Sequence, residues 1–435
     1  MKTRAQLHGV AVPSIVVRIA VPMECVLGNR VLFGFEVLMI LAISIQLALW
    51  FRPEPHSDWA YYWAAAGDVT RYERGGLSLW LLAIPKALGW SPLASALALN
   101  CLAALLLLCS SRALDPTAAR WFGLLVALYL LLITPFFSIV QLDMLAAAQL
   151  AVGVWLLASP PSRWSRRFTF FVAAVMIAAG VSTKPQYALT LWAMLGLFVA
   201  AWLVLKRRMH PFLPILFAVL LAGSVTGFTI DLGLRALSGR SEAIRTNSAV
   251  TLYSGLLVSG TGPRCGYWSA GAAEAAKADL SKPLHHAVLD RLAQKPPTHW
   301  ISVIGCKLPE IFRPGPYALY WLVESPNIRT RIDADPRRTE IDAAYRRALW
   351  WESHAYSALT LSILAMAAFT CIAMWRNAPL LALLPVLWIT SFWVVHIVFE
   401  IQGRYFLGIF LLVPLLCSIA LRVPRGVCGQ ISPKY

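Results

Sequence analysis

Residues 187–231 read YALTLWAMLGLFVAAWLVLKRRMHPFLPILFAVLLAGSVTGFTID. Two apolar runs, 187–205 and 211–231, flank a basic turn at 206–208. An apolar helix of about 20 residues crosses the hydrocarbon core of a membrane, and basic residues favour the cytoplasmic side of the spans that they flank. The stretch therefore predicts two membrane spans joined by a short cytoplasmic turn.

The composition of the whole chain agrees with this pattern. Of its 435 residues, 59% are hydrophobic and 14% are charged, whereas a soluble globular domain carries about 25% charged residues. A soluble enzyme, a DNA-binding protein and a disordered chain are therefore excluded. The formal net charge of +17 is explained by basic residues in short cytoplasmic loops, so we expect membrane lipids and no nucleic acid as partners.

Applied along the whole chain, the same criterion predicts an all-α polytopic membrane protein with about 10 transmembrane helices. The third and fourth spans are the weakest and are compatible with a helical hairpin broken at Thr134-Pro135. The predicted spans are 31–50, 92–110, 120–135, 143–159, 168–182, 187–205, 211–231, 354–375, 379–399 and 405–421.

With the N-terminus inside, this topology divides the chain into five parts. A cytoplasmic segment, 1–30, precedes spans one to seven at 31–231, which include a first outer loop at 51–91. A large outer loop at 232–353 is long enough for a small domain, and spans eight to ten at 354–421 precede a cytoplasmic tail at 422–435. In the outer loops, 313–336 is predicted to be irregular because it is rich in proline, and helices are predicted at 57–70, 77–89, 268–282, 283–296 and 338–352.

The large outer loop contains Cys265 and Cys306. An oxidising compartment favours a disulfide between two such cysteines. Two buried unpaired thiols are the alternative, because the sequence does not give the distance between them.

Charged residues near a membrane are costly and by default indicate a functional site. Asp58, in PHSDWAYYW with His56 and Tyr62, is either a helix cap or a catalytic carboxylate next to aromatic rings that suit sugars. Asp143, which starts the fourth span in QLDMLAAAQL, is likewise either a first-turn acid or part of a site.

Two basic residues lie at the predicted outer ends of other spans. Lys184, in STKPQ, either extends its ammonium toward water or binds an anionic headgroup. Arg404, in EIQGRYF, opens the last span, where a guanidinium and a helix N-terminus both favour phosphate. Its neighbours Gln402 and Tyr405 add hydrogen-bonding groups, and a simple ion pair with Glu400 is the alternative.

In this order, SDWAYYWAAA, LDMLAAAQLA, STKPQYALTLW and a late GRY resemble motifs of the GT-C superfamily of polytopic glycosyltransferases. The chain is most similar to the bacterial branch related to protein mannosyltransferases and the aminoarabinose transferase of lipid A. The resemblance covers the membrane part and not the loop at 232–353. It implies transfer of a sugar, with inversion, from a polyprenyl-phosphate-linked donor to a hydroxyl of a glycan, lipid or protein acceptor on the outer face of the membrane.

The resemblance also implies residue roles. Asp58 would be the general base, Asp143 would orient the acceptor or the sugar, and Lys184 and Arg404 would hold the lipid phosphate. Further substrate-binding candidates are His56, Tyr62, Glu400, Gln402 and Tyr405. No cofactor is expected, since a divalent metal needs more converging carboxylates than Asp58 and Asp143. We expect the bacterial inner membrane, with the active site facing the periplasm.

Two other functions remain open at this point. A surface-glycan polymerase or ligase would use a lipid-linked glycan and catalytic arginines of the large loop, for which Arg264 and Arg313 are available. A transporter of a lipid-linked or anionic substrate also fits spans with buried charges. Transporters, however, usually show repeated halves and broken helices near the membrane midplane.

Overall fold

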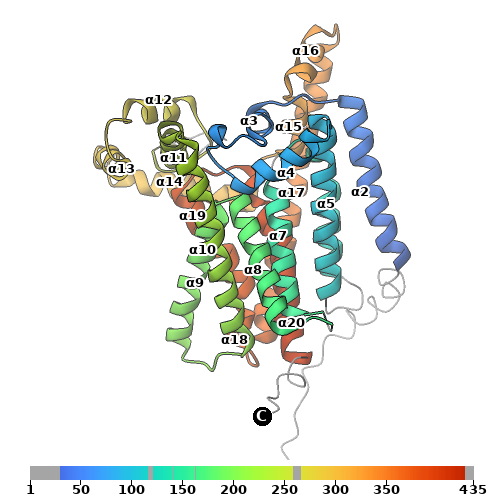
Figure 1. Cartoon of the computed structure of the whole chain (residues 1–435), viewed down its shortest axis with the longest axis vertical. Helices are drawn as coiled ribbons and strands as arrows, with labels where there is room; N and C mark the ends of the chain where they lie inside the picture. The colour runs from blue at the N-terminus through green and yellow to red at the C-terminus, as the bar shows by residue number, and fades with distance from the viewer. Residues whose placement is uncertain (1–29, 116–120, 141, 162, 258–265, 427–435) are drawn as a thin grey trace, which may run out of the picture.

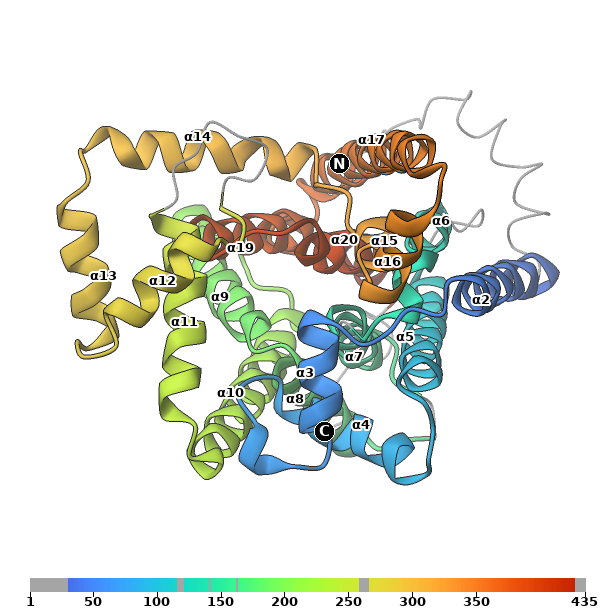
Figure 2. The same cartoon turned by 90° about the horizontal axis from the view of Figure 1, so that it is seen from above.

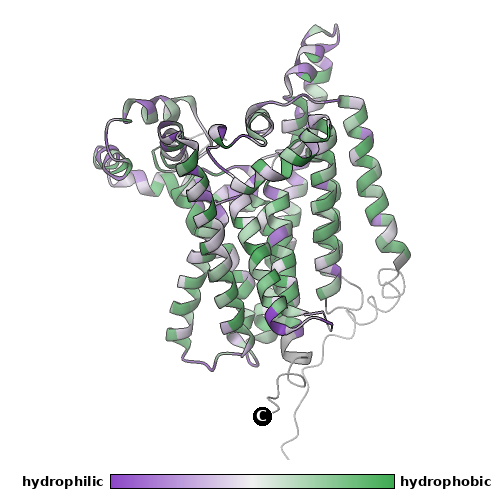
Figure 3. Cartoon of the chain, viewed as in Figure 1, coloured by the Kyte–Doolittle hydropathy of each residue, from purple (hydrophilic) through white to green (hydrophobic). Residues whose placement is uncertain are grey.

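The computed structural model describes residues 30–115, 121–140, 142–161, 163–257 and 266–426. Within these ranges the regular structure is entirely helical (Figure 1), which confirms the predicted fold class. Hydrophobic residues run along the bundle, and hydrophilic residues gather at its ends (Figure 3). The protein is an all-α polytopic membrane protein.

Seven of the described helices are long and apolar enough to cross a membrane. Three shorter apolar helices coincide with the remaining predicted spans. The long helices are α2 (Arg30–Phe51), α5 (Pro92–Leu114), α8 (Arg166–Thr183), α9 (Gln186–Leu205), α10 (Phe212–Ser238), α17 (Arg338–Met374) and α20 (Leu407–Gly426). The shorter ones are α6 (Trp121–Leu132), α7 (Asp143–Ala158) and α19 (Leu384–Val398), and a single turn, α18 (Pro379–Ala382), precedes α19.

The third and fourth predicted spans are separated by a break in the helix. After α6 the chain forms a short 3₁₀ helix, η2 (Thr134–Ser138), before α7 begins at Asp143. Asn100 of α5 donates its side-chain amide to the carbonyls of Phe137 at 3.0 Å and Ile139 at 2.9 Å. Non-helical backbone inside a membrane protein needs such internal partners, so Asn100 explains how the break at Thr134-Pro135 is accommodated.

Both long loops lie at one end of the bundle, which we call the loop face (Figure 1). The first loop forms α3 (Ser57–Ala65), η1 (Val69–Arg71) and α4 (Gly76–Ala87). Seen from above, α3 and α4 lie across the ends of α7 and α8, and α11 to α14 form a frame beside α19 (Figure 2). The large loop forms α11 (Ser241–Leu256), α12 (Ala270–Ala278), α13 (Leu284–Ala293), α14 (Thr298–Phe312), α15 (Ala318–Val323) and α16 (Pro326–Ala334).

One local prediction is wrong, and two elements predicted separately form a single helix. The segment 313–336 contains α15 and α16, because Pro326 occupies the first turn of α16, where a missing N–H costs nothing. The predicted boundary at 353/354 falls inside α17, which has 37 residues and neither glycine nor proline to interrupt it. The predicted loop helix at 338–352 and the predicted eighth span are therefore one continuous helix. Cys306 of α14 is disulfide-bonded, while Cys265, its expected partner, lies outside the described residues.

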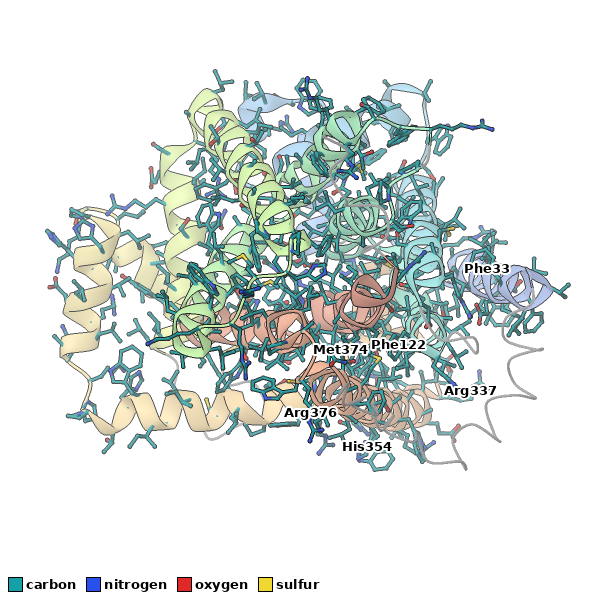
Figure 4. The ribbon with its side chains drawn as sticks, turned by 90° about the horizontal axis from the view of Figure 1, so that it is seen from below. Phe33, Phe122, Arg337, His354, Met374 and Arg376 are labelled. Atoms are coloured by element: carbon teal, nitrogen blue, oxygen red, sulfur yellow. The ribbon has the colours of Figure 1, made fainter. Side chains whose placement is uncertain are left out.

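Helix α2 lies at the edge of the bundle, as the position of Phe33 shows from below (Figure 4). Its buried Glu36 pairs with Arg112 at the end of α5. Both side chains are nearly inaccessible to solvent. This ion pair connects α2 to the rest of the bundle and gives Glu36 a structural role away from the loop face.

Replacing Arg112 by Met should destabilise the protein, because Glu36 is then buried without its ion pair. Removing one partner of a buried pair costs about 3–5 kcal/mol. The apparent melting temperature of the purified protein in detergent should fall for Arg112→Met and stay unchanged for Arg376→Met, which alters an exposed residue. Adding Glu36→Leu to Arg112→Met should recover part of the loss. A double variant as unstable as the single one would contradict this account.

Candidate functional site

Asp58 of α3 is held by two arginines from distant parts of the chain. Arg74 donates Nη2 to Oδ1, and Arg404 Nη2 lies 2.9 Å from Oδ2. Asp58 and Arg404 are both buried. The residue at the N-cap of α3 is His56, and no side chain caps the helix. The structure therefore shows Asp58 as the acceptor of two guanidinium groups and not as a helix cap.

Arg74 is positioned by a short segment that is tied to three helices. Tyr61 Oη of α3 accepts hydrogen bonds from the backbone N–H groups of Glu73 at 2.6 Å and Arg74 at 3.3 Å. The Glu73 carboxylate lies 2.9 Å from Arg240, just before α11, and the preceding Tyr72 donates its hydroxyl to Asp231 of α10. These contacts fix the backbone that carries Arg74.

A second ion pair lies beside the first. Lys184 Nζ, at the end of α8, is 3.1 Å from Asp143 Oδ2 at the start of α7, and both side chains are buried. Helices α7 and α8 approach closely here, because a Cβ at Gly180 would lie 2.9 Å from the Ala146 carbonyl oxygen. The other oxygen of Asp143 has no hydrogen-bond partner among the described residues.

Electrostatics connect the two pairs. Burial alone raises the pKa of Asp58, but the charges of Arg74, Arg404 and Lys184 outweigh burial and hold the pKa well below its usual range. Asp58 is thus ionised at neutral pH. A carboxylate with so low a pKa is a weak proton acceptor, which bears directly on its expected role as general base.

Arg404 is flanked by aromatic rings. It belongs to the 3₁₀ helix η3 (Gly403–Phe406), which leads into α20. Its guanidinium carbon lies 5.1 Å from the ring centre of Trp321 and 5.4 Å from that of Tyr405, distances at which cation–π attraction operates. The ring of His56 lies 5.7 Å from that of Trp321. These rings hold the guanidinium in place while its edge reaches Asp58.

The loop before Arg404 is held by the large loop. Glu400 N–H donates to the Thr251 carbonyl at 2.9 Å, and Ile401 N–H donates to the Gly266 carbonyl at 2.8 Å. Gly403 also approaches Gly315 so closely that a Cβ would collide with its carbonyl oxygen. Several of the contacts that set the path of 399–403 therefore come from residues between α10 and α17.

Lys307 of α14 completes this support. Its buried ammonium donates to the carbonyls of His396 at 3.0 Å, Ile397 at 2.7 Å and Phe399 at 3.0 Å. A cation at a helix C-terminus satisfies carbonyls that have no intrahelical partner. Burial lowers the pKa of Lys307 to about 7, although the charge of Glu400 acts in the opposite direction.

The structure brings the predicted site residues together, and their roles stay predictions. Asp58, Asp143, Lys184 and Arg404 form the two pairs. Tyr405 contacts Arg404, Tyr62 lies within electrostatic range of Arg74, and His56 is connected to Arg404 through Trp321. Glu400 accepts a hydrogen bond from Gln402. Sequence reasoning missed Arg74, Trp321 and Lys307. Among the described residues, no group of three or more His, Cys, Asp or Glu side chains is placed to hold a metal ion.

Of the two arginines proposed for a ligase, Arg313 does not join this cluster. The Arg313 side chain is exposed and donates to Ser353 at 3.5 Å. Arg264 lies outside the described residues.

An apolar groove of about 420 Å³ runs between α4, α8 and α10. Its lining includes the exposed rings of Trp80 and Phe171 and small residues such as Ala178 and Ala222. One part of the groove is lined by Gly76 and Ser182, which are two residues from Arg74 and Lys184. One end of the groove thus lies next to the backbone segments that carry both cations, although neither cation lines it.

In comparisons with known proteins, the chain matches no protein-family profile, no curated protein and no solved structure. Fold and site together define a polytopic membrane protein with a buried cluster of carboxylates and cations at the loop face.

Replacing Lys307 by Met should loosen the loop that carries Glu400. Three backbone carbonyls lose their donor, and leaving a buried acceptor unsatisfied costs about 1–3 kcal/mol. The backbone N–H groups of Glu400 and Ile401 should exchange with deuterium about tenfold faster or more, as mass spectrometry of the purified protein would show. Lys307→Arg should keep most of the protection. The control Lys282→Met removes an exposed lysine of the same loop that pairs with Asp290. Equal exchange in both Met variants would refute the role of Lys307.

Proposed function

We propose that this protein is a membrane glycosyltransferase that moves a sugar from a polyprenyl-phosphate-linked donor to an acceptor hydroxyl. The observation that carries the proposal is the cluster at one end of a membrane bundle in which the partly exposed Arg74 joins the buried side chains of Asp58, Asp143, Lys184 and Arg404. The cluster offers three cations to a phosphate and carboxylates to a hydroxyl. The resemblance to the GT-C superfamily supports the same function, and by that resemblance the loop face is the periplasmic side of a bacterial inner membrane.

The proposed reaction uses these groups as follows. The acceptor oxygen forms a bond to the anomeric carbon of the sugar, while the bond from that carbon to the lipid phosphate breaks. The hydroxyl proton passes to Asp58, and the anomeric configuration inverts. Arg404, Arg74 and Lys184 stabilise the negative charge of the departing phosphate, an effect that is largest where water is excluded.

The groove between α4, α8 and α10 supports a lipid donor. A prenyl chain is purely apolar, so it can lie in an apolar groove of a membrane bundle without burying a polar group and is held there by van der Waals packing. The groove is lined mostly by apolar side chains, and its lining residues Gly76 and Ser182 are two positions from Arg74 and Lys184 in the sequence. A lipid lying in it would present its phosphate to the cations of the cluster. Apolar tail and anionic head are thus accommodated by adjacent parts of the same surface.

The test is a transfer assay with the full-length protein in lipid vesicles and a panel of radiolabelled polyprenyl-phosphate sugars. Asp58→Asn should lower the rate of transfer about 100-fold or more, because it removes the proton acceptor. The control Asp68→Asn changes a half-exposed acid of the same loop, which pairs with Arg71, and should leave the rate unchanged. Full transfer by Asp58→Asn would remove Asp58 as the base. Absence of transfer from every donor, together with no binding of polyprenyl phosphate, would overturn the function.

Filling the groove should weaken the use of the lipid donor. Ala222 of α10 lines the groove, whereas Val225, one turn further along the helix, is exposed outside it. Ala222→Trp should raise the KM for the polyprenyl-linked donor at least several-fold with little change in kcat, while Val225→Trp should behave as the wild type. An unchanged KM in Ala222→Trp would place the prenyl chain elsewhere.

A further inference from the structure

Asp58 is bound in the way that an anionic ligand is bound. Each carboxylate oxygen meets a different guanidinium group, and the ammonium of Lys184 acts on the same carboxylate. Arginine and lysine side chains arranged around two oxygens of one anion are the usual surroundings of a phosphate. The side chain of Asp58 therefore occupies the position where an external phosphate would find its best partners.

Both arginines have contacts that do not involve Asp58, and Arg74 is also partly exposed. The Arg74 side chain is 41% exposed, and its Nε lacks a hydrogen-bond partner among the described residues. Arg404 is held by contacts with the rings of Trp321 and Tyr405, which do not depend on Asp58. Both guanidinium groups can thus change their anionic partner without losing their own support.

The charge balance favours such an exchange. Arg74, Arg404 and Lys184 carry three positive charges, whereas their contacting partners Asp58 and Asp143 carry two negative ones. Glu400 lies within electrostatic range of Asp58 and Arg404, but it accepts its hydrogen bond from Gln402. An added phosphate therefore enters a cluster in which the cations in direct contact outnumber the carboxylates.

We infer that Asp58 is a built-in occupant of the phosphate site, that the donor phosphate displaces it from Arg74 and Arg404, and that only the displaced carboxylate accepts the proton of the acceptor hydroxyl. The inference rests on the proposed function and adds the order of its steps: the donor phosphate binds before Asp58 accepts the proton. Once separated from the two guanidinium groups and placed near a phosphate, Asp58 regains proton affinity. The base is therefore weak in the empty protein and becomes effective after the donor has bound.

The decisive measurement is the affinity of the purified protein, in lipid nanodiscs, for polyprenyl phosphate. Asp58→Asn keeps the shape of the side chain and removes the competing charge, so it should bind polyprenyl phosphate about tenfold more tightly than the wild type. Arg404→Gln should bind it more weakly, and Asp68→Asn should match the wild type. A carboxylate that only helps to build the site would give the opposite result, with equal or weaker binding in Asp58→Asn, and that result would overturn the inference.

Failure of the inference can be told apart from failure of the proposed function. Uncharged polyprenol is the reference ligand: if the wild type binds it as well as polyprenyl phosphate, the proposed function itself fails. If the wild type prefers the phosphate and Asp58→Asn does not bind it more tightly, only the inference fails.

A wild-type experiment covers the case in which Asp58→Asn does not fold. Initial rates are measured with the donor that supports transfer, over a range of donor and acceptor concentrations. Polyprenyl phosphate should compete with the donor and be a noncompetitive inhibitor toward the acceptor. Uncompetitive inhibition toward the acceptor would mean that the acceptor must bind before the donor phosphate, and that result would overturn the inference.

Discussion

The structure depends on the rule that charges and backbone polar groups removed from water need partners within the protein. Glu36 and Arg112 satisfy each other between α2 and α5. Asn100 donates hydrogen bonds to backbone carbonyls in the helix break before α7, and Lys307 donates to the carbonyls at the end of α19. The cluster at the loop face follows the same rule, since Asp58 pairs with Arg74 and Arg404, and Asp143 pairs with Lys184.

Much of the fold follows from sequence because hydropathy acts over a whole span. Every predicted span coincides with an apolar helix, and the break at Thr134-Pro135 is where proline and the short apolar runs indicated it. The errors concern helix ends. Proline suggested a loop at 313–336, although Pro326 begins the helix α16. A change in composition near 353 suggested two separate helices, whereas α17 continues through this position without a break. The composition of a segment indicates whether water or lipid surrounds it. Whether a helix continues through that segment depends instead on residues such as glycine and proline that interrupt the backbone.

The site was predictable only in part. Asp143, Lys184 and Arg404 were found because a charge beside an apolar run is conspicuous. Arg74 and Lys307 lie in loops that contain many other basic residues, so nothing in the local pattern distinguishes them. The pairing of Asp58 with Arg404 was equally hidden, since residues 346 positions apart in the sequence (404 − 58) meet only through the fold. Sequence therefore suggested which residue types matter but not their geometry.

The pair formed by Asp58 and Arg404 also has a consequence for biosynthesis. Asp58 follows the first span and Arg404 precedes the last one, and a ribosome delivers spans to the membrane in that order. Until the final helix has been inserted, Asp58 has Arg74 as its cationic partner but not Arg404. The cluster around Asp58 consequently lacks Arg404 throughout most of the synthesis of the chain. A polypeptide that ends before Arg404 retains Asp58 but lacks one of the two arginines that pair with it.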